Sequence, residues 1–305
     1  MISDNARTCL IAGLVAGLAL PGLAKAMQPW LPQMVAALLT VTALRIGRDA
    51  AMGAISDLRW GLGSVAVLQL ILPIVLFGLC WALGISQTPV AMAIILATTA
   101  PAITGSPNLA LLLGQDGGRM MQIMVLGTAA FPLTVIPILW LLPQLGALSA
   151  ILAAAVTVLV VITVATFVGF SLRATFFPSP SAKQIKALDG LSVLAFSGIV
   201  VALMAALNPA LRSDPANVAL WALLAFAIGY GAQGLTLLCL RGSRLNHVAG
   251  PLAIGAGNRN IALFLVALPA DVLAPLMVFV GCWQLPMYLT PILLRRLYRS
   301  RASND

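Results

Sequence analysis

Ten stretches of this 305-residue chain are apolar over about 17 residues or more, and charged residues, Pro, Gly or Asn bound each of them. At about 1.5 Å of rise per residue, each stretch can form one helix across the hydrocarbon core of a bilayer. They cover residues 8–24, 30–46, 62–84, 89–114, 119–143, 147–173, 187–207, 217–241, 245–268 and 271–294. The sequence therefore predicts an all-α polytopic membrane protein with ten transmembrane helices, whose surroundings are the lipid bilayer.

The composition agrees with a membrane protein and excludes an ordinary soluble domain. Hydrophobic residues make up 61% of the chain, charged residues only 8%, and the mean hydropathy is +1.05. These values lie far outside the range of soluble globular proteins. The formal net charge of +9 does not indicate a nucleic-acid partner, because the basic residues are distributed by membrane side.

The basic residues also predict the orientation of the chain. If ten spans alternate in direction, fourteen of the seventeen Lys and Arg residues fall on one side of the membrane. Only Lys25 and Arg212 fall on the other side, and Arg259 lies within a span. Because cytoplasmic loops carry the excess of basic residues, we predict that both termini are cytoplasmic. We expect a multi-pass protein of the cell membrane, which would be the inner membrane of a bacterium.

The first 26 residues have some features of a secretory signal peptide. Arg7 precedes an apolar stretch at 9–20, and Ala24-Lys-Ala26 has the small-x-small form of a cleavage site. Cleavage would leave nine spans and would remove the symmetry between the two halves described next. We therefore expect residues 1–26 to be retained, with cleavage as the alternative.

Two short segments in the two halves of the chain match each other. Asn108-Leu-Ala-Leu and Asn260-Ile-Ala-Leu have asparagines 152 residues apart (260 − 108), half of the chain length. The simplest explanation is an internal duplication, with residues 1–145 as the first five-span repeat and 146–305 as the second. Because five is odd, the second repeat must enter the membrane from the opposite side, which predicts an inverted-topology repeat. A turn-rich cytoplasmic linker at 174–186 follows span six.

Both matching segments interrupt apolar runs, at 100–114 and 251–269, and predict discontinuous fourth and ninth helices that cross in the membrane. The residues expected to break these helices are Gly105, Pro107, Gly255 and Gly257. The polar residues expected to bind substrate there are Thr104, Ser106, Asn108, Asn258, Arg259 and Asn260. The alternative is that Pro and Gly only kink two spans, and that the polar residues cap the freed backbone groups.

Arg259 is the one basic residue predicted at mid-membrane depth. A charge there is rare and normally faces a partner or an aqueous cavity. The chain has no glutamate, and its eight aspartates lie in predicted loops or at span ends. A guanidinium with a planar fork of donors suits a carboxylate, sulfonate or phosphate. The alternative is a structural cation that binds carbonyls at the ends of half-helices, and the two roles can coexist.

The intramembrane polar positions could also bind a coupling ion or carry out catalysis. Gln69, Ser106 and Asn108 are candidates for a coupling-ion site, for Na⁺ or H⁺, although interhelical hydrogen bonding is the alternative role of Gln69. An enzyme would need a nucleophile with a base, or paired acids, within the spans. No predicted span has such a set, so we expect no catalytic residue, no metal site, no cofactor and no enzymatic activity.

These features resemble the bile acid:sodium symporter family, within the larger group of bile acid, arsenite and riboflavin transporters. Thr104-Gly-Ser106-Pro-Asn108 is similar to the family's fourth-span Thr-x-Ser-Asn signature, and Gly257-Asn-Arg259-Asn260 is similar to its ninth-span Gln-Asn motif. The resemblance extends to nearly the whole chain in architecture. It implies two inverted five-span repeats, with helices four and nine crossing at the centre.

The chain departs from that family at its sodium sites. The resemblance implies a ninth-span glutamate and a glutamine four residues later, and those positions hold Gly255 and Arg259. An arginine charge would repel a sodium ion bound a few Å away in a low-dielectric interior. We therefore expect sodium coupling to be altered or absent.

The sequence thus predicts a secondary transporter that moves a small organic anion, a carboxylate or a sulfonate, by alternating access. Two alternatives stay open: an ordinary sodium-coupled symporter of organic anions, and a membrane sensor that binds a ligand without moving it. A channel is disfavoured because the polar positions gather at one depth instead of lining a continuous path. Substrate identity, transport direction and oligomeric state do not follow from the sequence.

Overall fold

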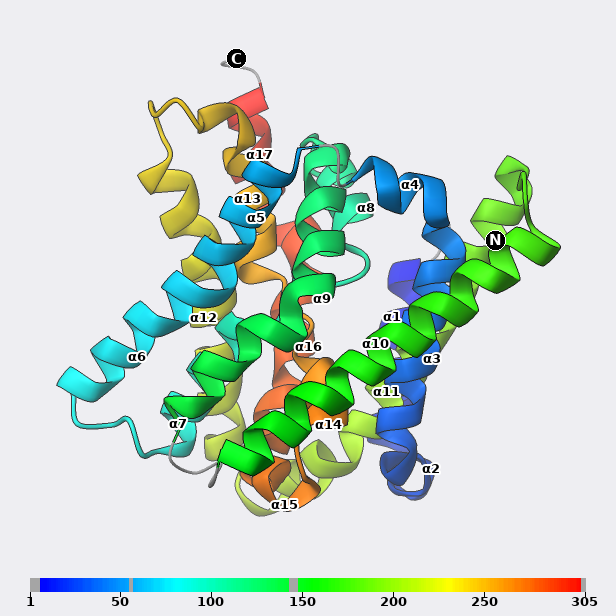
Figure 1. Ribbon diagram of the computed structural model, residues 1–305. Helices are drawn as coiled ribbons and strands as arrows, with labels where there is room; N and C mark the ends of the chain where they lie inside the picture. The colour runs from blue at the N-terminus through cyan, green and yellow to red at the C-terminus, as the bar shows by residue number, and fades with distance from the viewer. Residues whose placement is uncertain (1–5, 55–56, 143–147, 303–305) are drawn as a thin grey trace.

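The computed structural model describes residues 6–54, 57–142 and 148–302 (Figure 1). Within these ranges the regular elements are helices, and the one β feature is an isolated bridge between two single residues. Seven helical stretches are long and apolar enough to cross a membrane. They are Pro21–Ile46, Leu58–Ala82, Gly117–Trp140, Leu148–Phe176, Ala182–Ser213, Pro215–Cys239 and Ala270–Leu293. The all-helical, membrane-type prediction is confirmed at this level.

Three of the seven stretches are composed of several helical segments. The first joins α2 (Pro21–Met27), η2 (Gln28–Trp30) and α3 (Leu31–Ile46). The second joins α5 (Leu58–Ala66), the π-helical turn η3 (Val67–Ile71) and α6 (Leu72–Ala82). The last joins α15 (Ala270–Leu273), η7 (Ala274–Leu276) and α16 (Met277–Leu293). The others are single helices, namely α9 (Gly117–Trp140), α10 (Leu148–Phe176), α11 (Ala182–Ser213) and α12 (Pro215–Cys239).

The predicted span at 8–24 has different bounds in the structure. Helix α1 (Ala6–Ala19) ends five residues before the expected end (24 − 19), and the 25–29 loop expected after it is helical instead. The turn lies at Leu20, with φ −118° and ψ 68°. The ring of Pro21 explains this, since it disfavours a helical conformation of the preceding residue and suits the first position of a new helix.

Two more predicted spans, 89–114 and 245–268, are interrupted in the middle. The first consists of α7 (Pro89–Thr99) and α8 (Ser106–Leu112). The second consists of α13 (Ala249–Gly257), the short η6 (Ile261–Leu263) and α14 (Phe264–Ala267), and η5 (Asn246–Val248) precedes it. Both interruptions lie where the sequence places Gly, Pro and polar residues. Each leaves a few residues of non-helical backbone inside the molecule.

The helices pack as two groups (Figure 1). The α3 group comprises α1, α2, α3, α10 and α11, in which α11 packs on α1, α2 and α3, and α10 packs on α3. The α9 group comprises α5 to α9, α12, α13 and α16, in which α9 packs on α5, α8 and α13, and α12 packs on α13 and α16. The two groups meet where α10 crosses α9 and where α11 lies along α16.

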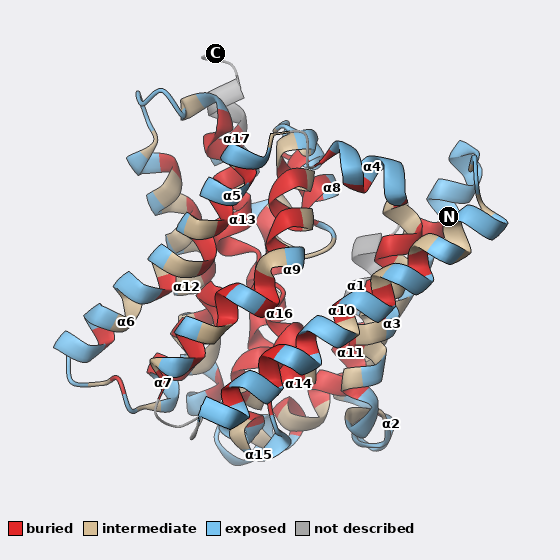
Figure 2. Cartoon of the chain, in the orientation of Figure 1, coloured by how far each residue is buried: buried red, intermediate tan, exposed pale blue. Residues whose placement is uncertain are grey.

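Side chains are buried toward the centre of the molecule and along the contact between the groups, and the outer helix faces are exposed (Figure 2). Many exposed side chains are large and apolar, such as Val75 on α6 and Phe167 on α10. Small residues allow close packing inside. A Cβ added to Gly169 of α10 would lie 2.6 Å from the Thr40 carbonyl oxygen of α3. Because large apolar side chains cover them, the outer helix faces suit contact with lipid tails.

Two short surface helices lie at the same end of the molecule (Figure 1). These are α4 (Arg48–Gly53) and α17 (Arg295–Ala302). Between α10 and α11 the predicted 174–186 linker is shorter than expected, because only residues 177–181 are not helical. Helix α11 begins early through a capping box in which Ser181 and Gln184 bond each other's backbone amides.

Candidate functional site

The two interrupted stretches meet in the interior through a short antiparallel bridge between Ala102 and Arg259. The amide of Ile103 donates to the Asn258 carbonyl oxygen at 3.0 Å, and the amide of Asn260 donates to the Pro101 carbonyl oxygen at 2.7 Å. Non-helical backbone is tolerated at membrane depth only where protein or water satisfies its polar groups. Each break therefore supplies hydrogen-bond partners for the other.

The guanidinium of Arg259 lies beside this bridge and binds three backbone carbonyls. Nε donates to Ala256 at 3.0 Å, Nη1 to Ala100 at 3.0 Å and Nη2 to Leu68 at 2.9 Å. These oxygens belong to three different segments: the end of α13, the end of α7 and the π-helical turn η3. The side chain is 1% exposed. Arg259 thus acts as a cation that holds three chain segments at one point.

The Leu68 carbonyl is available because of the proline that follows it. In a helix this oxygen would accept from the amide of Leu72 or, in a π-turn, from that of Pro73. The Leu72 amide donates to Val67 instead, and Pro73 has no N–H. The sequence VLQLILP thus leaves one main-chain acceptor without its helical donor, and Arg259 supplies the missing donor.

The other two acceptors are also helix-end carbonyls. Ala100 follows the last residue of α7, so the helix does not continue to provide a donor. The oxygen of Ala256 would normally accept from Asn260, but that amide donates to Pro101 across the bridge. The three carbonyls are therefore products of the helix breaks, and an arginine at position 259 satisfies all of them.

Packing fixes the backbone around Arg259. The indole Nε1 of Trp283 on α16 donates to the Arg259 carbonyl oxygen at 3.0 Å. A Cβ added to Gly257 would lie 2.1 Å from the Gly229 carbonyl oxygen of α12. Asn258 donates through Nδ2 to Ile254 at 3.1 Å. Its side-chain oxygen accepts from Thr290 at 3.2 Å. These groups form a closed polar network inside the α9 group.

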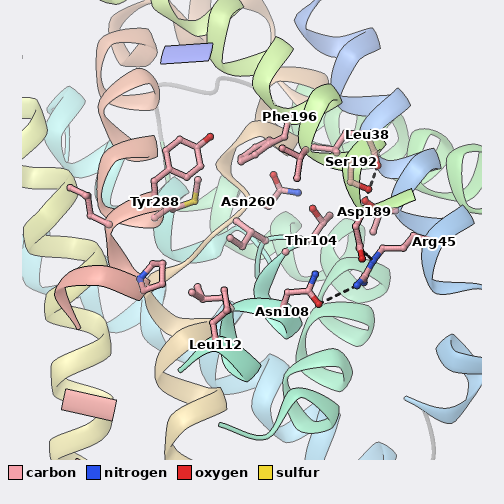
Figure 3. A pocket seen from close by; sticks show the side chains of 18 of the residues that line it. Leu38, Arg45, Thr104, Asn108, Leu112, Asp189, Ser192, Phe196, Asn260 and Tyr288 are labelled. Carbon is pink, nitrogen blue, oxygen red and sulfur yellow. Dashed lines mark hydrogen bonds and ion pairs between the residues drawn. The ribbon is translucent and has the colours of Figure 1, made fainter. Parts of the chain in front are cut away.

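A cavity of about 360 Å³ lies beside the bridge, between the two helix groups (Figure 3). It is formed by α3, α8, α11, α16 and both helix breaks. Its lining residues are Leu38, Thr42, Arg45, Ile103, Thr104, Gly105, Asn108, Leu109, Leu112, Asp189, Ser192, Val193, Phe196, Asn260, Met287, Tyr288, Leu289, Pro291 and Ile292. A volume of this size is typical of small-molecule sites.

The ion pair and the aromatic pair that line this cavity lie apart from each other (Figure 3). Arg45 and Asp189 form an ion pair between α3 and α11, and Arg45 Nη2 donates to the Asn108 side-chain oxygen at 3.1 Å. On the opposite side Phe196 and Tyr288 pack edge to face, with ring centroids 5.9 Å apart. The cavity therefore suits a ligand with one polar end and one apolar end.

The predicted substrate residues divide into two sets. Thr104, Asn108 and Asn260 line the cavity, and so does the predicted helix-breaking Gly105. The matched asparagines of the two repeated motifs thus lie at the same site. Arg259, Asn258 and Ser106 do not line the cavity, nor do Pro107, Gly255 and Gly257. For Arg259 the contacts match the structural-cation alternative of the sequence analysis.

The predicted ion-binding residues have separate surroundings. Gln69 accepts a hydrogen bond from Thr134 of α9 at 2.8 Å, as expected for an interhelical contact. Asn108 accepts from Arg45. Ser106 is fully buried, and its Oγ has no hydrogen-bond partner among the described residues. Within that part of the chain, no cluster of His, Cys, Asp or Glu could hold a metal ion.

Among the lining residues that the sequence pattern did not single out, Arg45 and Asp189 are the charged ones. In the sequence Arg45 is one of the fourteen basic residues on the predicted cytoplasmic side, and Asp189 is one of the aspartates at a predicted span end. Their separation of 144 residues gives no local pattern. One signal was present in the sequence. Arg45 lies one residue before the end of the predicted span 30–46, and Asp189 lies two residues after the start of the span 187–207, where a charge needs a partner.

The sequence matches no protein-family model, and it matches no curated protein at a significant level. The resemblance to bile acid:sodium symporters therefore depends on the two short motifs and on the predicted architecture.

Proposed function

We propose that this protein is a secondary transporter for a small amphipathic organic anion, with its substrate site in the cavity between the α3 and α9 groups. The observation that carries the proposal is the contact of this cavity with both helix breaks. Thr104 and Gly105 come from one break, Asn108 from the first turn of α8 that follows it, and Asn260 from the other break. A central site at the crossing of two discontinuous helices is typical of carriers that use alternating access.

The helix inventory supports ten spans in two inverted repeats. Seven stretches are long and apolar enough to cross a membrane. Helix α1 and the two interrupted stretches would bring the number to ten, with five in residues 1–145 and five in 146–305. In this arrangement α7–α8 and α13–α14 are the discontinuous fourth and ninth helices. The α3 group would contain spans one, two, six and seven, and the α9 group the remaining six.

The basic residues support an orientation with the cavity toward the cytoplasm. Arg48 lies in α4 and Arg295 begins α17, at the end of the molecule where these two short helices lie (Figure 1). Arg45 of the cavity is close to the same end, since it is in the last turn of α3. By the positive-inside rule this end is cytoplasmic. The structure would then represent an inward-facing state of the carrier.

The contacts of Arg259 support transport without sodium. Three carbonyls from three segments surround its guanidinium, in the way that oxygens surround a bound cation. The family resemblance implies sodium ligands near this position. We infer that the fixed charge of Arg259 replaces a bound ion and holds the crossing together during the transport cycle. A sodium ion beside it would be repelled.

Countertransport in proteoliposomes tests the proposed function. Vesicles are loaded with a mixture of unlabelled organic carboxylates and sulfonates, and labelled members are added outside in choline or sodium buffer. We expect protein-dependent uptake of at least one labelled anion, at equal rates in the two buffers. A protein that binds an anion in equilibrium dialysis without exchanging it would be a sensor. Uptake that requires sodium would identify an ordinary symporter.

A further inference from the structure

One ion pair, between Arg45 and Asp189, lines the cavity. The position of this pair indicates where the charged end of a substrate would bind. Arg45 and Asp189 are the only charged residues that line the cavity within the described part of the chain. Their side chains are 18% and 26% exposed, respectively. The pair is thus accessible from the cavity but is largely shielded from bulk solvent.

The guanidinium of Arg45 is held in place and is only partly used. Its Nε donates to Asp189 and its Nη2 to Asn108, whereas Nη1 makes no hydrogen bond to any described residue. Arg173 of α10 fixes the backbone here, because its Nη1 donates to the carbonyl oxygens of Leu44 and Arg45 at 3.2 and 3.1 Å. The Nη1–Nη2 edge can therefore donate hydrogen bonds to a carboxylate or sulfonate, which would replace the side-chain oxygen of Asn108 as the acceptor at Nη2.

We propose that Arg45 is the anion-selecting residue of the cavity and that Asp189 is its competing internal anion. This inference rests on the proposed function, since it names the group that would bind the substrate's charge. The substrate class is a monovalent carboxylate or sulfonate with an apolar body. The charged end binds Arg45 and Asn108. The apolar end packs against Phe196 and Tyr288 on the other side of the cavity (Figure 3).

In this arrangement Asp189 competes with the bound anion for the guanidinium of Arg45. An unpaired arginine in a largely apolar cavity would be costly in the empty protein. The carboxylate neutralises Arg45 when no substrate is present, and a bound anion must share the guanidinium with it. Anion binding is therefore weaker, and release easier, than at an isolated arginine.

Charged thiol reagents test this proposal without knowledge of the substrate. Ser192 lines the cavity one turn after Asp189 on α11, and Ser192→Cys is nearly isosteric. The native cysteines are first replaced by alanine. The probes are the sulfonate reagent sulfonatoethyl methanethiosulfonate, its trimethylammonium analogue and the neutral methyl methanethiosulfonate. The rate of each charged reagent is divided by that of the neutral reagent, which corrects for changes in accessibility.

We expect the sulfonate-to-neutral ratio to fall by roughly tenfold in Arg45→Gln and to rise by a similar factor in Asp189→Asn. The trimethylammonium ratio should change in the opposite directions. Arg48→Gln is the matched control, because Arg48 is exposed on α4, three residues further on, and does not line the cavity. It should leave both ratios within about twofold of the parent.

The proposal is overturned if Arg45→Gln and Arg48→Gln have equal effects, which would make the ion pair a structural link between α3 and α11. It is also overturned if Asp189→Asn lowers the sulfonate ratio. If Arg45→Gln does not fold, the double variant Arg45→Gln/Asp189→Asn replaces it, because an anion-selecting Arg45 predicts a lower sulfonate ratio in the double variant than in Asp189→Asn alone. Countertransport is measured separately, so a failure here is distinguishable from a failure of the transporter assignment.

Discussion

At the residue scale, Arg259 is the side chain on which the helix crossing depends. Its contacts with three carbonyls predict that Arg259→Ala destabilises the protein in the absence of any ligand. Leaving buried carbonyls unsatisfied costs about 1–3 kcal/mol each, so the apparent melting temperature should fall by on the order of 10 °C. Arg48→Ala, an exposed arginine on α4, should change stability by about 0.5 kcal/mol or less. Equal effects of the two substitutions would contradict this role.

Gly257 permits another prediction at the same scale. A Cβ at this position would overlap the backbone oxygen of Gly229, which cannot move aside as a flexible side chain could. Gly257→Ala should therefore separate α12 from α13 and destabilise the protein by about 1–3 kcal/mol, as overpacking does. Gly231→Ala on α12 is the control, because nothing lies within 4 Å of its added Cβ. It should be neutral or slightly stabilising in thermal unfolding.

At the element scale, α5 and α9 are joined at their N-terminal ends by Asp57 and Arg119. Asp57 caps α5 by accepting from the Trp60 amide at 3.3 Å, and its other oxygen accepts from Arg119 at 2.8 Å. The Arg119 hydrogen bond, followed by that of the Trp60 amide, holds the pKa of the Asp57 carboxyl below its usual value. This link forms only while the carboxylate is ionised.

The sign of the pH effect follows from the lowered pKa. The stabilisation should be complete above the unfolded-state pKa of about 3.9 and should be lost as the pH falls through the lower folded-state pKa. Asp57→Asn keeps an N-cap residue but removes the charge. The melting temperatures of wild type and variant should therefore differ slightly at pH 7 and converge as the pH falls through the lowered pKa of Asp57. A difference that grows toward acid pH would refute the link.

The boundaries of the helices were predicted well where a continuous apolar run ends in charged residues. The seven long stretches agree with the predicted spans to within several residues at most ends, and both helix breaks occur where Gly, Pro and Asn interrupt the pattern. The early turn at Leu20 was missed because the loss of helical freedom before Pro21 is local, whereas span length was judged from hydropathy. The same local rule would have located it.

The candidate site was predicted only in part, for a physical reason. Sequence pattern identified Thr104, Asn108 and Asn260, which lie at helix breaks. It did not reveal whether a buried polar group faces a cavity or a carbonyl, since this depends on partners distant in the chain. Arg259 binds carbonyls 159 and 191 residues away. The same long-range dependence explains why the pairing of Arg45 with Asp189 was not foreseen.

At the scale of the whole molecule, two helix groups contact each other around a cavity while Arg259 holds the breaks inside one of them. In the proposed transport cycle the α3 group moves against the α9 group, which requires η6 and α14 to change their contacts with α3 and α10. In the proposed cycle the cavity residues from α3 and α11 change their contacts with α8 and α16. The carbonyl contacts of Arg259 stay intact throughout, because all three of its partners belong to the α9 group.

A pair of substitutions tests whether Arg259 occupies the place of an ion site. The family resemblance implies glutamate at position 255 and glutamine at position 259. The three atoms nearest to a Cβ added at Gly255 belong to the side chains of Ile123, Leu68 and Met120, at 3.2 to 3.4 Å, and not to rigid backbone. We predict that Gly255→Glu combined with Arg259→Gln gains sodium-dependent thermal stability. Stability of this variant that is independent of sodium would argue against a shared location.

The most direct test of the central claim, that a fixed arginine charge replaces a bound sodium ion, is the melting temperature of the purified wild-type protein. It is measured in sodium chloride and in choline chloride at equal ionic strength. A ligand that binds only the folded state adds about 2.7 kcal/mol at a hundredfold excess over its dissociation constant, which a thermal scan detects. The account predicts identical melting temperatures in the two salts. A saturable increase specific to sodium would contradict it.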